Sequence, residues 1–326
     1  MSEPSGTEDR AATALTLCLV GHPGAFLDWG TAVIGDALAQ AGLSPQVDSL
    51  PHAEARDAMP GEVRLLQATG PVLSRPELVV ARTIVLLDDP ARAFRDSISR
   101  TADPADSVRA MSALLAPLAG LLRQPGTVLI ERPAEGDPAA LRQRIIAAAL
   151  PELAVEDGGR EIELASPPPL GPVAQGLLRQ VIRPMHDFAT GASAGPIILP
   201  LACFYGSDPM GEQAPPLCDA AGPGRAVYYG PYMHMPQGRW RIEAECYFSQ
   251  ELCNALIAVD VFTDTILARA EFAPPAEGHF KVVFRVTVPR ADERLEVRLW
   301  VVRGIIGGLI GLRQVTWFRE EDGAGR

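Results

Sequence analysis

The chain has 326 residues, of which 47% are hydrophobic and 21% are charged. This balance supports a packed core and argues against wholesale disorder, and the length suits two domains of roughly 100–200 residues each. The formal net charge of −11 repels a phosphate backbone, so we expect no nucleic-acid partner. Lys281 is the single lysine among 29 basic residues, which leaves no lysine for a phosphate-binding loop.

The cysteine pattern and the termini narrow the class of protein further. Five cysteines are scattered without a CxxC or CxxH spacing, so we expect reduced core thiols, no metal site and no cofactor. The apolar run 299–312 carries Arg303 and is too short for a membrane span. The first ten residues lack the basic region of a secretory signal. We expect a cytoplasmic protein, or one assembled onto a surface or particle without a signal peptide.

The first half of the chain alternates between two apolar patterns. We predict a disordered tail over 1–11 and an α/β domain over 12–164. Three apolar runs indicate buried strands: 13–21, 78–89 and 126–132. Three segments have helical spacing: 31–43, 107–123 (despite Pro117) and 137–153 with Asp137 as its N-cap. Strands that alternate with helices predict a parallel sheet.

The second half of the chain contains two segments with different sequence patterns. Residues 165–224 are predicted to hold one helix over 173–191 with a kink at Pro184, and a Pro/Gly-rich connection that packs over one or both domains. From 225 to 320 apolar residues recur at every second position in three segments: 239–248, 279–288 and 294–302. This period predicts an antiparallel, jelly-roll-like β-sandwich, followed by a tail over 321–326.

The stretch GHPGAFLDWG (21–30) joins a predicted strand to a predicted helix, which is the geometry of many phosphate sites. It resembles the donor loop of the sulfotransferase-like fold, an α/β relative of the P-loop kinases, whose pattern is P-[KR]-[ST]-G-[ST]-[ST]-W. Pro23 and Trp29 match its two ends. Between them, from Gly24 to Asp28, the basic residue and the hydroxyls that hold the donor PAPS are absent, and Asp28 places an acid where a phosphate would lie.

A second donor motif of that family is also altered in the stretch 86–97. Pro90 matches, but Asp88 stands at the arginine position and Asp96 at the serine position. An acid in place of an arginine repels a phosphate, so we interpret 12–164 as a degenerate sulfotransferase-like domain. Two alternatives are weighed against this interpretation: His22 as a catalytic base, and a metal site of acidic residues. The acids in question are Asp28, Asp88, Asp89 and Asp96.

The stretch AVYYGPYMHMPQGRW (226–240) resembles the start of a β-sandwich module in bacterial proteins associated with glycosyl transfer and surface polysaccharide. The module resembles carbohydrate-binding jelly rolls, which implies a glycan ligand. Aromatic rings stack on the C–H faces of sugars, and polar side chains bind their hydroxyls. The candidate contact residues are Tyr229, Tyr232, His234, Tyr247, Trp300, Arg241 and Arg298. In the alternative interpretation the motif is a structural arch in which Gly230 and Gly238 make turns and Trp240 fills the core.

These features favour a non-catalytic protein that recognises a bacterial surface polysaccharide through its C-terminal sandwich. The N-terminal domain then serves as a scaffold or as a docking surface for a protein partner or assembly. Two alternatives stay open. One is a divergent sulfotransferase, or another transferase, that acts on a glycan. The other is a structural component of a surface assembly or phage-like particle, of the head or tail-spike type.

Overall fold

The computed structural model describes residues 15–50, 62–69, 80–132, 137–152, 169–192 and 195–320. The chain packs as two compact units, each assembled from two stretches. The first unit takes the described residues within 1–89 and 122–166, and the second takes those within 90–121 and 167–326. The segment 90–121, which lies inside the predicted α/β domain, therefore packs with the C-terminal strands.

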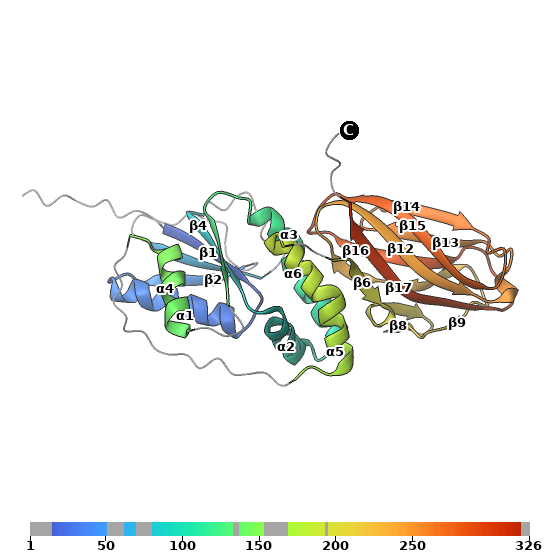
Figure 1. The fold of residues 1–326 in the computed structure, drawn as a ribbon, viewed down its shortest axis with the longest axis horizontal. Coiled ribbons are helices and arrows are strands. Elements are labelled where there is room, and N and C mark those ends of the chain that lie inside the picture. Colours follow the sequence, from blue (N-terminus) through green and yellow to red (C-terminus); the bar gives the residue numbers. More distant parts are fainter. Residues whose placement is uncertain are drawn as a thin grey trace, which may run out of the picture. The chain divides into compact units, whose positions relative to one another are not determined.

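The N-terminal unit contains a five-stranded parallel sheet in the order β2-β3-β1-β4-β5, so the predicted parallel sheet is confirmed (Figure 1). Its strands are β1 Leu15–Gly21, β2 Pro45–Ser49, β3 Val63–Ala68, β4 Arg82–Leu87 and β5 Thr127–Glu131. Helices α1 Ala25–Gln40 and α4 Pro138–Ala149 contact each other and share one apolar core with the sheet. Asp137 caps α4, as predicted: its side chain accepts a hydrogen bond from the Ala139 amide at 2.9 Å.

Two strands of this sheet, β2 and β3, lie in a region for which the sequence analysis predicts no strand. Polar residues interrupt the apolar run of β3, and their partners lie on other elements. Arg64 in β3 is only 1% exposed, and it forms an ion pair with Asp48 of β2 at 2.8 Å. The partner that makes burial of Arg64 possible lies on another strand, so the sequence of β3 alone gives no sign that this arginine can be buried. A search for apolar runs therefore misses this strand.

The C-terminal unit contains two antiparallel sheets (Figure 1). The seven-stranded sheet has the order β14-β13-β16-β10-β7-β8, with β11 paired to β16; the five-stranded sheet has the order β15-β12-β17-β6, with β9 paired to β17. The bounds are β6 Ile197–Pro200, β7 Tyr205–Ser207, β8 Met210–Gln213, β9 Cys218–Asp219, β10 Arg225–Tyr229, β11 Pro231–His234, β12 Gly238–Phe248, β13 Ile257–Phe262, β14 Ile266–Phe272, β15 Gly278–Val288, β16 Arg294–Val301 and β17 Leu309–Arg319.

The predicted alternation of buried and outward residues is confirmed on two strands. The inward residues of β12 are at most 2% exposed: Trp240, Ile242, Ala244, Cys246 and Phe248. Those of β16 are at most 1% exposed: Leu295, Val297, Leu299 and Val301. On β15 the prediction holds only for Phe284, Val286 and Val288, since Phe280 and Val282 stay partly exposed. β15 is an edge strand, so it has a neighbour on one side only.

The sheets begin before the predicted sandwich boundary at 225. β6 pairs with β17, β7 pairs with β10, and β9 pairs with β17, so the Pro/Gly-rich stretch supplies strands to both sheets. These strands are two to four residues long, too short for a period of two to be recognised.

Helices pack beside these sheets within the same unit (Figure 1). They are α2 Pro90–Thr101, α3 Pro104–Leu121, α5 Pro172–Leu177 and α6 Arg183–Thr190, with a π-helical turn at Leu178–Ile182. α3 runs through Pro117, as predicted, and contacts α6 and β11. Near Pro184, where a kink is predicted, the helix contains the π-helical turn, which ends two residues before this proline that has no N–H to donate. None of the described helices is long and apolar enough to span a membrane.

Candidate functional site

The structure divides the seven predicted contact residues into three locations. Since Leu295, Val297 and Leu299 point into the sandwich, their neighbours on β16 face outward. The outer face of the seven-stranded sheet carries Arg298 and Trp300, together with Tyr229 and Tyr232. The outer face of the five-stranded sheet carries Arg241 and Tyr247 on β12. His234 is buried. We call the first of these surfaces the β16 face.

An ion-pair network lies at the centre of the β16 face. Asp260 on β13 is fully buried, and it lies opposite Arg298 of β16 and Arg269 of β14 in the strand register. Arg298 donates from Nε to Oδ1 at 2.8 Å and from Nη2 to Oδ2 at 3.2 Å, while Arg269 donates from Nη1 to Oδ2 at 3.1 Å. One carboxylate thus holds two guanidinium groups in place through charge-assisted hydrogen bonds.

Aromatic rings flank this network. The Arg298 guanidinium lies 4.1 Å from the centroid of the Phe262 ring and 5.2 Å from that of Trp300. Trp300 faces Ala258 on one neighbouring strand and Ala226 on the other. Both residues directly opposite the half-buried indole are therefore small, whereas Arg298 and Arg269 flank its ring diagonally, the latter at 5.9 Å from the centroid. The indole Nε1 is buried and has no hydrogen-bond partner among the described residues.

The face continues along β16 toward Tyr232. The Tyr232 hydroxyl lies beside the Glu296 carboxylate. Burial, together with the neighbouring Glu296 charge, raises the pKa of Tyr232 to about 12. Burial also raises the pKa of Glu296, against the opposing effect of Arg298. Tyr232 therefore keeps its proton at neutral pH.

Three tyrosines complete the face. The ring centroids are 5.8 Å apart for Tyr205 and Tyr229, 6.0 Å for Tyr205 and Tyr232, and 6.2 Å for Tyr229 and Tyr232. The Tyr229 hydroxyl accepts a hydrogen bond from the Gly211 amide at 2.8 Å. The planar side chains of the β16 face thus form a series of two groups: one contains Trp300, Arg298 and Phe262, and the other contains Tyr205, Tyr229 and Tyr232.

Arg109 of α3 fixes the Tyr205 end of this series. Its guanidinium lies 4.5 Å from the Tyr205 ring centroid. It donates to the Pro231 carbonyl at 2.8 Å and to the Cys203 carbonyl at 3.0 Å. The helix therefore ties the turn before Tyr232 to the strand that carries Tyr205.

Several residues of this face were not among the predicted contacts: Tyr205, Phe262, Arg269, Glu296 and Arg109. Arg109 lies in a helix far along the chain from the sandwich, and Tyr205 lies in a strand of three residues. Phe262, Arg269 and Glu296 could have been predicted as surface residues, because each stands at an outward position in the alternating pattern of a sandwich strand.

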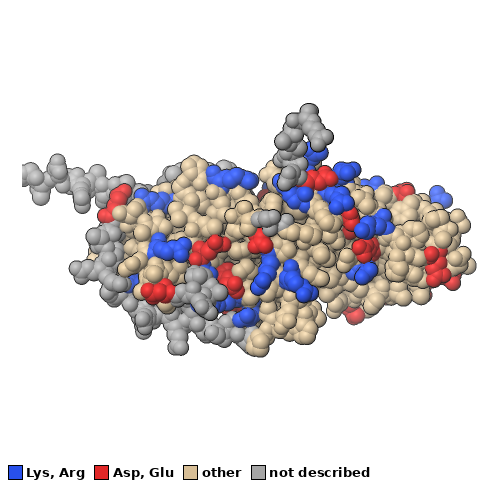
Figure 2. Space-filling view, viewed as in Figure 1, with Lys and Arg blue, Asp and Glu red and all other residues tan. Residues whose placement is uncertain are grey.

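The charges of the β16 face nearly cancel. Arg269 and Arg298 are offset by Asp260 and by Glu271, which binds Arg269 at 2.8 Å. Glu296 lies beside Tyr232, and the charge of Arg298 acts on it. On the side of the molecule drawn in Figure 2, basic and acidic side chains are intermixed. A ligand of the β16 face therefore meets little net charge.

The other predicted contacts form a separate group on the five-stranded sheet. Arg241 lies 4.3 Å from the Phe318 ring centroid and pairs with Glu243 at 2.6 Å. Tyr247 donates to Glu277 at 2.7 Å, and its ring centroid is 5.2 Å from that of His279. Arg241 and Tyr247 thus point outward from the five-stranded sheet. Trp300 points outward from the other sheet, so these two residues are not part of the β16 face.

His234 and Trp240 belong to the core. His234 is 6% exposed, and its amide donates to the Ser112 hydroxyl of α3 at 3.1 Å. Burial lowers the pKa of His234, and Arg294 lowers it further. Trp240 is 2% exposed and donates to the Pro236 carbonyl at 2.9 Å. The structure places both side chains in packing roles.

The stretch that resembles a donor loop is mostly helical in the structure. α1 begins at Ala25, so only Pro23 and Gly24 form a turn, and Asp28 and Trp29 belong to the helix. Trp29 is 4% exposed, with its ring centroid 5.9 Å from that of Phe26. Apolar residues at helical spacing explain the early start, because three of the first five helical positions are buried in the core.

The four acidic residues considered for a metal site do not form one cluster. Asp28 is exposed in the first turn of α1, where a carboxylate suits the helix dipole. Asp88 pairs with Arg132 at 3.3 Å. Asp96 lies in α2, which belongs to the other unit. The described residues contain no group of three or more potential metal ligands.

No family model and no curated protein matches the chain. Solved structures similar to part of it include the C-terminal CBM6 of LamC, a marine laminarinase from Zobellia galactanivorans. That structure is 12% identical, with a TM-score of 0.26, over 38% of this chain and 100% of its own. The CBM36-1 domain of a multidomain xylanase from the hindgut metagenome of Trinervitermes trinervoides is 11% identical, with a TM-score of 0.27, over 40% and 100%. At these scores and identities the similarities assign the chain to no family.

Proposed function

We propose that the protein binds a glycan through the β16 face and performs no chemistry on it. The observation that carries this proposal is that two groups of planar side chains lie on the same face of one sheet: Trp300, Arg298 and Phe262 form one, and Tyr205, Tyr229 and Tyr232 form the other. Sugar rings present C–H faces that stack on aromatic surfaces, and a chain of several sugars is long enough to contact both groups. Tyrosine and tryptophan offer large contact areas together with polar tips.

The ion-pair network supports the proposal because it is already assembled. Asp260 holds Arg298 and Arg269 at 2.8 to 3.2 Å, so their free N–H groups keep fixed directions. A ligand then binds with less loss of side-chain entropy than on flexible arginines. The guanidinium groups are suited to donate to sugar hydroxyls beside the rings.

The balance of charges favours a neutral glycan. Arg269 and Arg298 already have carboxylate partners, so a strongly anionic polymer gains little from them and meets the acidic chain at a net charge of −11. The resemblance of 226–240 to a polysaccharide-associated module suggests a bacterial surface polysaccharide as the source of the ligand. We propose that the N-terminal unit is a scaffold, or a docking surface for a protein partner or assembly.

A glycan array that includes bacterial capsular polysaccharides, probed with the full chain, tests this function. We expect binding to neutral glycans, loss of that binding in Trp300→Ala, and retention in Tyr247→Ala, which changes the opposite sheet. Failure of the wild-type chain to bind any glycan contradicts the proposal. Equal binding by wild type and Trp300→Ala contradicts the assignment to the β16 face.

A further inference from the structure

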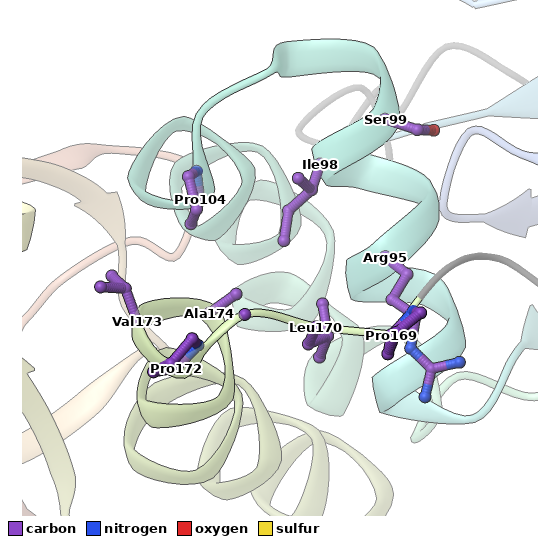
Figure 3. A pocket seen from close by; sticks show the side chains of 10 residues that line it. Arg95, Ile98, Ser99, Pro104, Pro169, Leu170, Pro172, Val173 and Ala174 are labelled. Atoms are coloured by element: carbon purple, nitrogen blue, oxygen red, sulfur yellow. The ribbon is translucent and has the colours of Figure 1, made fainter.

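A cavity of about 360 Å³ lies in the helical part of the C-terminal unit (Figure 3). α2 forms one wall, and the chain entering α5 forms the other. Pro104, at the start of α3, closes one side. The size falls within the range of small-molecule sites, about 300–1,000 Å³. None of its lining residues belongs to the β16 face.

The walls of the cavity are apolar and stiff. Ile98 of α2 and Leu170 both project toward the space between the helices (Figure 3). Pro169 and Pro172 on either side of Leu170 restrict the backbone of the entering chain. Prolines at these positions keep the wall in place without a ligand, so little conformational entropy is lost on binding.

Arg95 supplies the main charged group of this lining. Its side chain extends past Pro169 at one end of the cavity (Figure 3). Its Nε is buried and has no hydrogen-bond partner among the described residues. Arg100, on the same helix, differs: its Nε donates to the Asp96 carbonyl at 3.2 Å, and its guanidinium lies 3.9 Å from the Asp96 carboxylate. A buried donor without a partner is costly, and a ligand with an acceptor there removes that cost.

We propose that this cavity binds a small linear amphiphile with a carboxylate head. The apolar tail lies between Ile98 and Leu170, and the carboxylate accepts hydrogen bonds from Arg95. A carboxylate fits best because the planar guanidinium fork matches its two oxygens. The proposal is independent of glycan binding, since the cavity and the β16 face share no residue.

Isothermal titration calorimetry of the full chain with octanoate tests the proposal. Octan-1-ol and acetate serve as the tail-only and head-only probes. We expect saturable binding of octanoate, weaker binding of octan-1-ol and none of acetate. Arg95→Gln should weaken octanoate binding by about tenfold, with little effect on octan-1-ol. Arg100→Gln is the matched control and should bind octanoate as wild type does.

A second pair of variants tests the tail. Ile98→Trp fills the cavity and should abolish octanoate binding. Val173 lines the rim of the cavity and is 62% exposed, so we expect Val173→Trp to fold, to narrow the entrance and to weaken octanoate binding, which tests the site if Ile98→Trp does not fold. Absence of octanoate binding by wild type overturns the proposal. Equal losses in Arg95→Gln and Arg100→Gln, or unchanged binding in Val173→Trp, overturn it as well.

Discussion

Asp260 and Arg298 face each other across β13 and β16 in a two-point ion pair, with distances of 2.8 and 3.2 Å. Asp260 is fully buried, whereas the Arg298 side chain is 18% exposed. The carboxylate thus lies beneath the guanidinium groups that it orients. This arrangement makes Asp260 a positioning residue of the β16 face, because it shapes the surface without reaching it.

Asp260→Asn should destabilise the protein. Removal of one partner from a buried ion pair costs about 3–5 kcal/mol. Since the Arg298 and Arg269 side chains stay 18% and 30% exposed, water compensates in part, and we expect about 2 kcal/mol. The midpoint of urea unfolding measures this loss. Glu320→Gln, whose partner Arg285 is 74% exposed, is the control and should shift the midpoint little; equal shifts contradict the prediction.

Arg298→Lys should weaken glycan binding while the charge is kept. Lysine cannot form the two-point pair with Asp260, and it has no planar group to lie over Phe262. We expect a loss of about tenfold in affinity, measured by calorimetry with the glycan that binds best on the array. Arg285→Lys, on the five-stranded sheet, is the matched control. Unchanged affinity in Arg298→Lys would remove this residue from the site.

The strands with long alternating patterns were predictable because each carries its own signal. On β12 and β16 every second residue packs into the same core, so the period of two appears in the sequence itself. The outward positions follow from the same period, which is how Arg298 and Trp300 were found. The period does not tell which sheet a strand joins, and so Tyr247 and Arg241 were grouped with residues of the opposite face.

The remaining features depend on contacts that no local pattern contains. Pro23 and Trp29 match the ends of a donor loop, but core packing of Phe26 and Trp29 draws that stretch into α1. Tyr205 joins the site through a strand of three residues. Arg109 reaches the sandwich from a helix that lies before it in the chain. Each of these outcomes is decided by partners distant in sequence, which a single sequence does not identify.

Arg109→Ala should destabilise the C-terminal unit by about 2 kcal/mol, because two buried carbonyls lose a charged donor. The tyrosine signal in near-ultraviolet circular dichroism should also weaken, since Tyr205 loses the guanidinium over its ring. Asp106 pairs with Arg109 but is 52% exposed, so Asp106→Ala is the control and should have little effect on either measurement. A wild-type spectrum and unfolding midpoint in Arg109→Ala would contradict the role assigned to this contact.

The buried His234 should make stability fall in mild acid. Its pKa is lowered below the usual 6.5, first by burial and then by Arg294, with Asp292 acting in the opposite direction. Below pH 6.5 the unfolded chain binds a proton that folded His234 does not take up, so stability is full above that pH and declines as the pH falls toward the folded pKa. His234→Phe removes this contribution and also the buried Nδ1 that has no described partner.

Urea unfolding at a series of pH values from 7.5 to about 5 measures the difference between the two proteins. Wild type should lose more stability over this range than His234→Phe, since the other titratable groups are common to both. His279→Phe on the exposed strand β15 is the matched control and should retain the wild-type slope. Parallel pH profiles for wild type and His234→Phe would show that His234 titrates alike in the folded and unfolded chains, against the packing between β11 and α3 described here.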